Sequence, residues 1–113
     1  MLHFIETPLF TKQIKDLTDD DNYRDLQEDL IKNPQQGDLV QGTGGVRKTR
    51  WSSSSSTGKS GGMRIIYYYI EESGKFFMLL AYPKSKKVTL SAAEKANLRK
   101  FTNAIKQVLH NEQ

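Results

Sequence analysis

The 113-residue sequence contains no cysteine, which excludes disulfide bonds, thiolate nucleophiles and zinc sites built from cysteine. Its two histidines, His3 and His110, lie near the ends of the chain, so no central histidine is available to pair with a nucleophile. No apolar run approaches the roughly 18 residues of a membrane-spanning helix, and we recognise no leader peptide. We therefore expect a soluble, cytoplasmic protein with no membrane partner, no metal and no cofactor.

Acidic residues are missing from a long central stretch. None occurs from Leu39 to Ile70, although the whole chain contains 13 of them. Residues 1–38 contain nine acids and four Lys/Arg, whereas residues 39–113 contain four acids and thirteen Lys/Arg. Such a division indicates a polyanionic partner on one surface, although a solvated basic face fits the charge alone equally well.

The spacing of apolar residues predicts an α+β fold in a single domain, residues 1–113. Thr7-Pro8 and Asp19 to Asp21 mark two helix starts, and Ser91 with Glu94 forms a capping box before a third helix. Strands are expected at residues 2–6, 46–51, 63–70 and 75–82. The predicted order is β-α-α-β-β-β-α, a small curved antiparallel sheet with helices packed on one side.

Side-chain alternation sorts the cations of the predicted strands onto faces. Lys48 and Arg50 share a face of residues 46–51 with Val46, whereas Arg47 lies on the opposite face with Thr49 and Trp51. Arg64 shares a face of residues 63–70 with Ile66, Tyr68 and Ile70. Tyr67, Tyr68 and Tyr69 are expected in the core and on the sheet surface.

Two short motifs resemble nucleotide-binding signatures but do not meet their requirements. "TGKSGG" lacks the earlier glycine of a phosphate loop, because position 53 is serine, and it lies between strands rather than before a helix. "GTGG" lacks the third glycine of a dinucleotide fingerprint, because that position is Arg47. Glycines 42, 44 and 45 instead predict a tight turn into the basic strand.

Without cysteine or a central histidine, cleavage of a phosphodiester would have to use arginine, lysine and tyrosine. RNA is the substrate for which this is feasible, because its own 2′-hydroxyl is the nucleophile. The protein then has to orient that group, accept its proton and stabilise the charge that develops on phosphorus, which fixed cations can do.

Nearly the whole chain resembles the RelE/ParE superfamily of type II toxins, in its HigB-like branch. The resemblance is carried by "NPQQGDLVQGTGGVRKTRW", "GKSGGMRIIYYY" and "LLAYPKSKKVTLSAAEKANLRKF", in that order. It implies a curved antiparallel sheet flanked by helices. It also implies a ribosome-dependent mRNA endonuclease that uses 2′-hydroxyl attack without metal. The implied partners are the ribosome, mRNA and a cognate antitoxin, which in many HigB-type systems carries a helix-turn-helix domain.

The resemblance also assigns roles to individual residues. Lys48 and Arg50 stand at basic positions of the family's first hairpin strand, and Arg64 at an arginine linked to transition-state stabilisation. Tyr82 and Lys84 match a Tyr-x-Lys motif at the end of the last strand. The expected catalytic residues are therefore Arg64, Lys48, Arg50, Tyr82 and Lys84. The expected RNA-binding residues are Arg47, Lys59, Lys86 and Lys87.

Two other functions remain open on the sequence. A ParE-like inhibitor of DNA gyrase that cleaves nothing would share the same fold, and so would a degraded member that only binds its antitoxin. The cations on strands favour RNA cleavage over both. Which cation acts as acid or base stays open, as do codon preference, the antitoxin's identity, the oligomeric state and the role of Ser52 to Ser56.

Overall fold

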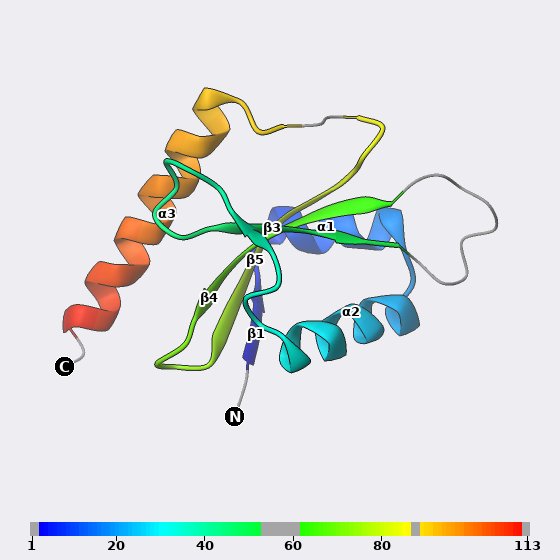
Figure 1. Cartoon of the computed structure of the whole chain (residues 1–113), viewed down its shortest axis with the longest axis horizontal. Helices are drawn as coiled ribbons and strands as arrows, with labels where there is room; N and C mark the ends of the chain where they lie inside the picture. The colour runs from blue at the N-terminus through cyan, green and yellow to red at the C-terminus, as the bar shows by residue number, and fades with distance from the viewer. Residues whose placement is uncertain (1–2, 53–61, 87–88, 112–113) are drawn as a thin grey trace.

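The computed structural model describes residues 3–52, 62–86 and 89–111. These ranges contain five strands that form one sheet, and three helices. In chain order the elements are β1 (His3–Glu6), α1 (Pro8–Leu17), α2 (Asp20–Lys32), β2 (Asp38–Leu39), β3 (Arg47–Trp51), β4 (Met63–Ile70), β5 (Lys75–Pro83) and α3 (Ala92–Asn111). Figure 1 shows that α1 and α2 lie on one side of the sheet and that α3 lies on the other side. No helix in the described ranges is long and apolar enough to cross a bilayer.

The helix starts follow the capping signals in the sequence. The Thr7 side chain accepts a hydrogen bond from the Phe10 amide, and Pro8 occupies the first turn, where it needs no amide hydrogen. The Asp19 carboxylate accepts from the Asn22 amide at the start of α2. Before α3, the Ser91 amide donates to Glu94 Oε1 while the Glu94 amide donates to Ser91 Oγ, which confirms the predicted capping box.

The sheet has the order β1-β5-β4-β3-β2, which confirms the α+β class. Neighbours are antiparallel except β1, which runs parallel to β5, so the sheet is mixed and the expectation of a purely antiparallel sheet was wrong at this edge. The parallel pair is possible because two helices and three strands separate β1 from β5, a connection long enough to return the chain in the same direction. The two-residue strand β2 is an element that the sequence patterns did not predict.

Both faces of the sheet are covered, so the expectation that the helices pack on one side was wrong. The physical reason lies in β4 and β5, which are buried on both faces and therefore need a helical layer on each. We call the α1–α2 side the closed face; its core contains Phe10, Ile14, Leu26, Leu30, Met63, Ile65, Tyr67, Phe76, Met78 and Ala81. We call the α3 side the open face; its core contains Val46, Ile66, Tyr68, Ile70, Leu79, Tyr82, Leu90 and Leu98.

The turn that leads into β3 is held by α3. Gly42, Gly44 and Gly45 all have positive φ, as expected for a tight turn before the basic strand. Thr102 of α3 is fully buried and its hydroxyl donates to the Thr43 carbonyl at 2.8 Å. A Cβ atom at Gly44 would lie 2.5 Å from the Thr102 hydroxyl oxygen, so this position requires glycine. These contacts fix the position at which β3 begins, and therefore the positions of the cations on this strand.

Candidate nucleic-acid interface

Three cations from two neighbouring strands gather on the open face. Arg50 of β3 is the cross-strand partner of Arg64 of β4, and Lys48 is the partner of Ile66, so all three side chains share one face. They line a hollow of about 460 Å³, here called the basic hollow. Its lining consists of Gln36, Asp38, Lys48, Thr49, Arg50, Arg64 and Thr89. The structure therefore brings Lys48, Arg50 and Arg64 together on one face.

Arg64 is the most buried of these cations, with 9% of its surface exposed. Among the described residues, no side chain forms a hydrogen bond or ion pair with Arg64, Arg50 or Lys48. A cation withdrawn from water without a counter-charge raises the free energy of the folded protein unless an anion compensates it. With Lys48, Arg50 and Arg64 against the single carboxylate of Asp38 among the described lining residues, the basic hollow has a net positive charge that is chemically suited to an anion.

Arg47 has a different environment, although it lies between Val46 and Lys48 on the same strand. Its side chain lies on the closed face, where Nη1 donates to the Gln35 carbonyl at 3.1 Å and to the Gly37 carbonyl at 2.7 Å. Arg47 thus ties β3 to the segment between α2 and β2. The structure does not bring it to the basic hollow.

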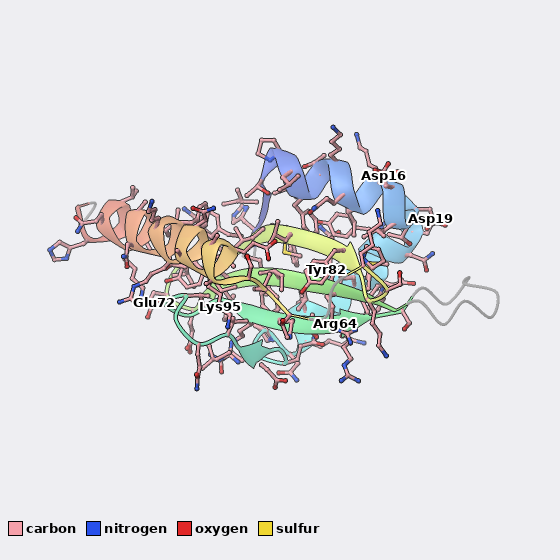
Figure 2. The ribbon with its side chains drawn as sticks, turned by 90° about the horizontal axis from the view of Figure 1, so that it is seen from above. Asp16, Asp19, Arg64, Glu72, Tyr82 and Lys95 are labelled. Carbon is pink, nitrogen blue, oxygen red and sulfur yellow. The ribbon has the colours of Figure 1, made fainter. Side chains whose placement is uncertain are left out.

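Tyr82 is the cross-strand partner of Arg64 on β5 and is buried in the open-face core, 7% exposed. Figure 2 shows Arg64 and Tyr82 close together on neighbouring strands, beside the segment that leads to α3. Lys84 and Lys86 follow in the exposed turn beyond β5, outside the lining of the basic hollow. Lys59 and Lys87 lie outside the described residues.

The hollow also contains groups that sequence patterns did not identify. Asp38 of β2 is the cross-strand partner of Lys48, so a carboxylate stands at the edge of the cation cluster. Gln36 accepts a hydrogen bond from the Thr49 hydroxyl at 3.3 Å and donates to the Asp29 and Asn33 carbonyls. Thr89 completes the wall from the segment before α3. The usable signal for Asp38 was its position as the last acid before the acid-free stretch.

The three consecutive tyrosines of β4 pack as expected. Tyr67 is fully buried, and its hydroxyl donates to the Pro34 carbonyl at 2.8 Å and accepts from the Gly37 amide at 3.2 Å. Burial raises the pKa of Tyr67 above its ordinary value, and burial together with the Glu72 charge raises that of Tyr68. Neither phenol is suited to accept a proton near neutral pH, so both belong to the core rather than to the chemistry.

The chain is similar to known proteins in its sequence and in its fold. A family model described as the RelE toxin of the RelE/RelB toxin–antitoxin system matches residues 7–113. Among solved structures, the chain is similar to E. coli toxin RelE in the free state, in a mutant form with two arginine-to-alanine substitutions. That match has 14% sequence identity and a TM-score of 0.50, and it covers 76% of this chain and 86% of that chain. At this identity the likeness shows a shared fold.

Proposed function

We propose, from the premise that the chain belongs to the RelE toxin family of toxin–antitoxin systems, that it inhibits translation by cutting mRNA on the ribosome. Membership of such a system implies an antitoxin partner. The proposal names the ribosome and mRNA as further partners. It also includes a cytoplasmic location and a place in the HigB-like branch.

The observation that carries the proposal is the environment of Arg64. Arg64 is 9% exposed, forms no ion pair with a described residue and lines the basic hollow with Lys48 and Arg50. A guanidinium fork matches two phosphate oxygens at once, and its charge is permanent. Because the strands hold it rigidly, Arg64 can stabilise charge as it develops on phosphorus without reorganising.

The proposed reaction uses the 2′-hydroxyl of the RNA as its nucleophile. The 2′-oxygen attacks phosphorus and loses its proton to a base, the bond from phosphorus to the 5′-oxygen breaks, and that oxygen takes up a proton. The products are a 2′,3′-cyclic phosphate and a 5′-hydroxyl. Lys48, Arg50 and Arg64 neutralise the phosphorane. Asp38 is the one carboxylate among the described lining residues, so we assign it the role of proton acceptor.

We expect cleavage to depend on the ribosome because of the geometry that in-line attack requires of the mRNA. The basic hollow can attract a phosphate, but free mRNA samples many backbone conformations, and few of them place the 2′-oxygen in line with the bond that breaks. A ribosome that holds the codon in a bent conformation would supply the missing alignment. We therefore expect weak, salt-sensitive binding to free RNA and little cleavage of it.

The deciding experiment adds the purified protein to a defined translation reaction and maps mRNA ends by primer extension, with naked mRNA at the same concentration in parallel. New ends within the translated region, and few on naked RNA, are the expected result. A supercoiling assay with DNA gyrase runs alongside. Inhibition of gyrase without any new mRNA end would overturn the proposal in favour of a gyrase inhibitor.

A further inference from the structure

A second hollow of about 280 Å³ adjoins the basic hollow on the open face. The two share Asp38, Lys48 and Thr89 in their linings, so they meet at these residues. The second hollow extends from these shared residues to Leu39, Leu90 and Lys95. In Figure 2, Lys95 lies in the first turn of α3, next to the connection from β2 to β3.

The lining of the second hollow combines three kinds of group. Its apolar groups are Val40, which is partly buried against the open-face core, and Leu90 of that core. Gln41 adds an exposed side-chain amide. Lys95 contributes a cation that forms no ion pair with any described residue, at the start of α3, where the helix dipole also favours negative charge.

A nucleotide presents the matching set: an apolar base face, polar groups on the base edge, and a phosphate. We propose that the second hollow binds the nucleotide on the 5′ side of the scissile phosphate, with Lys95 contacting that nucleotide's own 5′-phosphate and Val40 contacting its base. This proposal rests on the proposed function, which places the scissile phosphate in the basic hollow beside Arg64.

The position of Asp38 decides the direction of the strand. Asp38 belongs to both hollows, at their junction. If it accepts the proton of the attacking 2′-hydroxyl, the ribose that carries this hydroxyl must lie beside it. That ribose belongs to the nucleotide on the 5′ side of the phosphate being cut, so the RNA enters the second hollow in the 5′ direction. The nucleotide on the 3′ side then leads away from Lys95.

The test is a titration of the full-length protein with dinucleotides, followed by nuclear magnetic resonance. A 2′-deoxy first nucleotide prevents cleavage, and the dinucleotide carries a 5′-phosphate, a 3′-phosphate or neither. We expect the 5′-phosphate to improve affinity about tenfold, as for a charge-assisted contact, and to shift the Leu90 and Lys95 amide signals. The 3′-phosphate should add much less. An equal gain from either phosphate would overturn the assigned direction.

Matched variants separate this inference from the proposed function. Lys95→Ala should remove the gain from the 5′-phosphate, whereas Lys100→Ala, the same charge change at an exposed position of α3, should preserve it. Val40→Ala should weaken binding several-fold by removing apolar surface from the base. All three variants are compared with the parent for thermal unfolding, so that a folding defect is not read as a binding defect.

Three results would overturn the inference. If binding depends on Arg64 but the 5′-phosphate adds nothing, the second hollow is not a nucleotide site and the proposed function stands. If Lys95→Ala binds RNA normally but weakens the antitoxin complex, the hollow is a protein-binding surface. If no binding depends on Arg64 and no mRNA is cut on ribosomes, the proposed function and this inference fail together.

Discussion

Arginine side chains on the two faces of the sheet differ in their hydrogen bonding. On the closed face, Arg47 donates two hydrogen bonds to backbone carbonyls, and its charge holds the segment before β2 in place. On the open face, Arg64 is more deeply buried yet has no hydrogen-bond or ion-pair partner among the described residues. On neighbouring strands, one arginine is bonded to the fold and the other forms no hydrogen bond or ion pair through its side chain with any described residue.

The difference arises from how completely the helices cover each face. α1 and α2 close one side with large, fully buried side chains such as Phe10, Leu26 and Leu30. α3 covers the other side mainly with half-buried residues, Phe101, Ile105 and Leu109, and it begins only at Ala92. The part of β3 and β4 that holds Arg50 and Arg64 is left open as the basic hollow. The closed face thus contributes buried apolar surface to the stability of the fold, whereas the incomplete cover on the open face leaves the side chains of the basic hollow accessible.

The sharpest test of this comparison is the removal of Arg64. Arg64→Ala should lower the rate of mRNA cleavage by roughly 10²–10³, because loss of one preorganised donor typically has this effect. Arg64→Lys should be clearly impaired as well, since lysine lacks the planar fork. Single-turnover cleavage in the translation reaction measures both, with Arg24→Ala, an exposed arginine of α2, as the control. A folded Arg64→Ala protein that cuts at the parental rate would remove Arg64 from the site.

Asp38 tests whether the open face also supplies the base. Asp38→Asn keeps the size of the side chain but cannot accept the proton, so cleavage should fall about 10²-fold, the lower range for general-base catalysis. Asp25→Asn, at an exposed position of α2, is the matched control. Unchanged cleavage by Asp38→Asn would exclude Asp38 as the base and leave the acid and the base to be identified among the expected catalytic residues.

Tyr67 tests the closed face through stability. Tyr67→Phe keeps the ring but removes the hydroxyl shared by Pro34 and Gly37, so unfolding should require about 1–3 kcal/mol less free energy at pH 7. Since burial raises the pKa of Tyr67 from 10.0, the folded state holds this proton more tightly than the unfolded chain. That contribution is complete below pH 10 and is lost as the pH rises through the folded-state pKa.

Urea unfolding of the parent and Tyr67→Phe at pH 7 and at a pH above 10 measures both effects. The parent should lose more stability than the variant between the two pH values. Tyr69→Phe, a change on the same face at a position without such a hydrogen-bond pair, is the comparison. An equal alkaline loss in parent and variant would show that Tyr67 does not contribute to it.

Arg47 gives the smallest expected effect and completes the comparison. Arg47→Ala removes two hydrogen bonds to backbone carbonyls, so it should lower stability by about 1–2 kcal/mol while leaving the cleavage rate of the folded protein unchanged. Thermal unfolding and single-turnover cleavage are measured on the same sample. A loss of cleavage comparable to that of Arg64→Ala would restore the RNA-binding role that is expected for Arg47 from the sequence.

Much of this molecule could be predicted from local patterns. The caps at Thr7, Asp19 and Ser91 were readable because each depends on contacts within a few residues. The faces of β3 and β4 followed from a period of two. The parallel pairing of β1, the strand β2 and the helices on both faces were not predicted. Each depends on segments far apart in the chain, and no local pattern encodes which of them meet.

The candidate site divides in the same way. The sequence by itself determined that Lys48 and Arg50 share a face and that no acid lies between Leu39 and Ile70. Only the tertiary structure decided that Arg50 and Arg64 are cross-strand partners, that Asp38 stands opposite Lys48, and that Arg47 is occupied elsewhere. The physical reason is that alternation fixes a side chain's direction, whereas register and the coverage of each face fix its neighbours and its access to water.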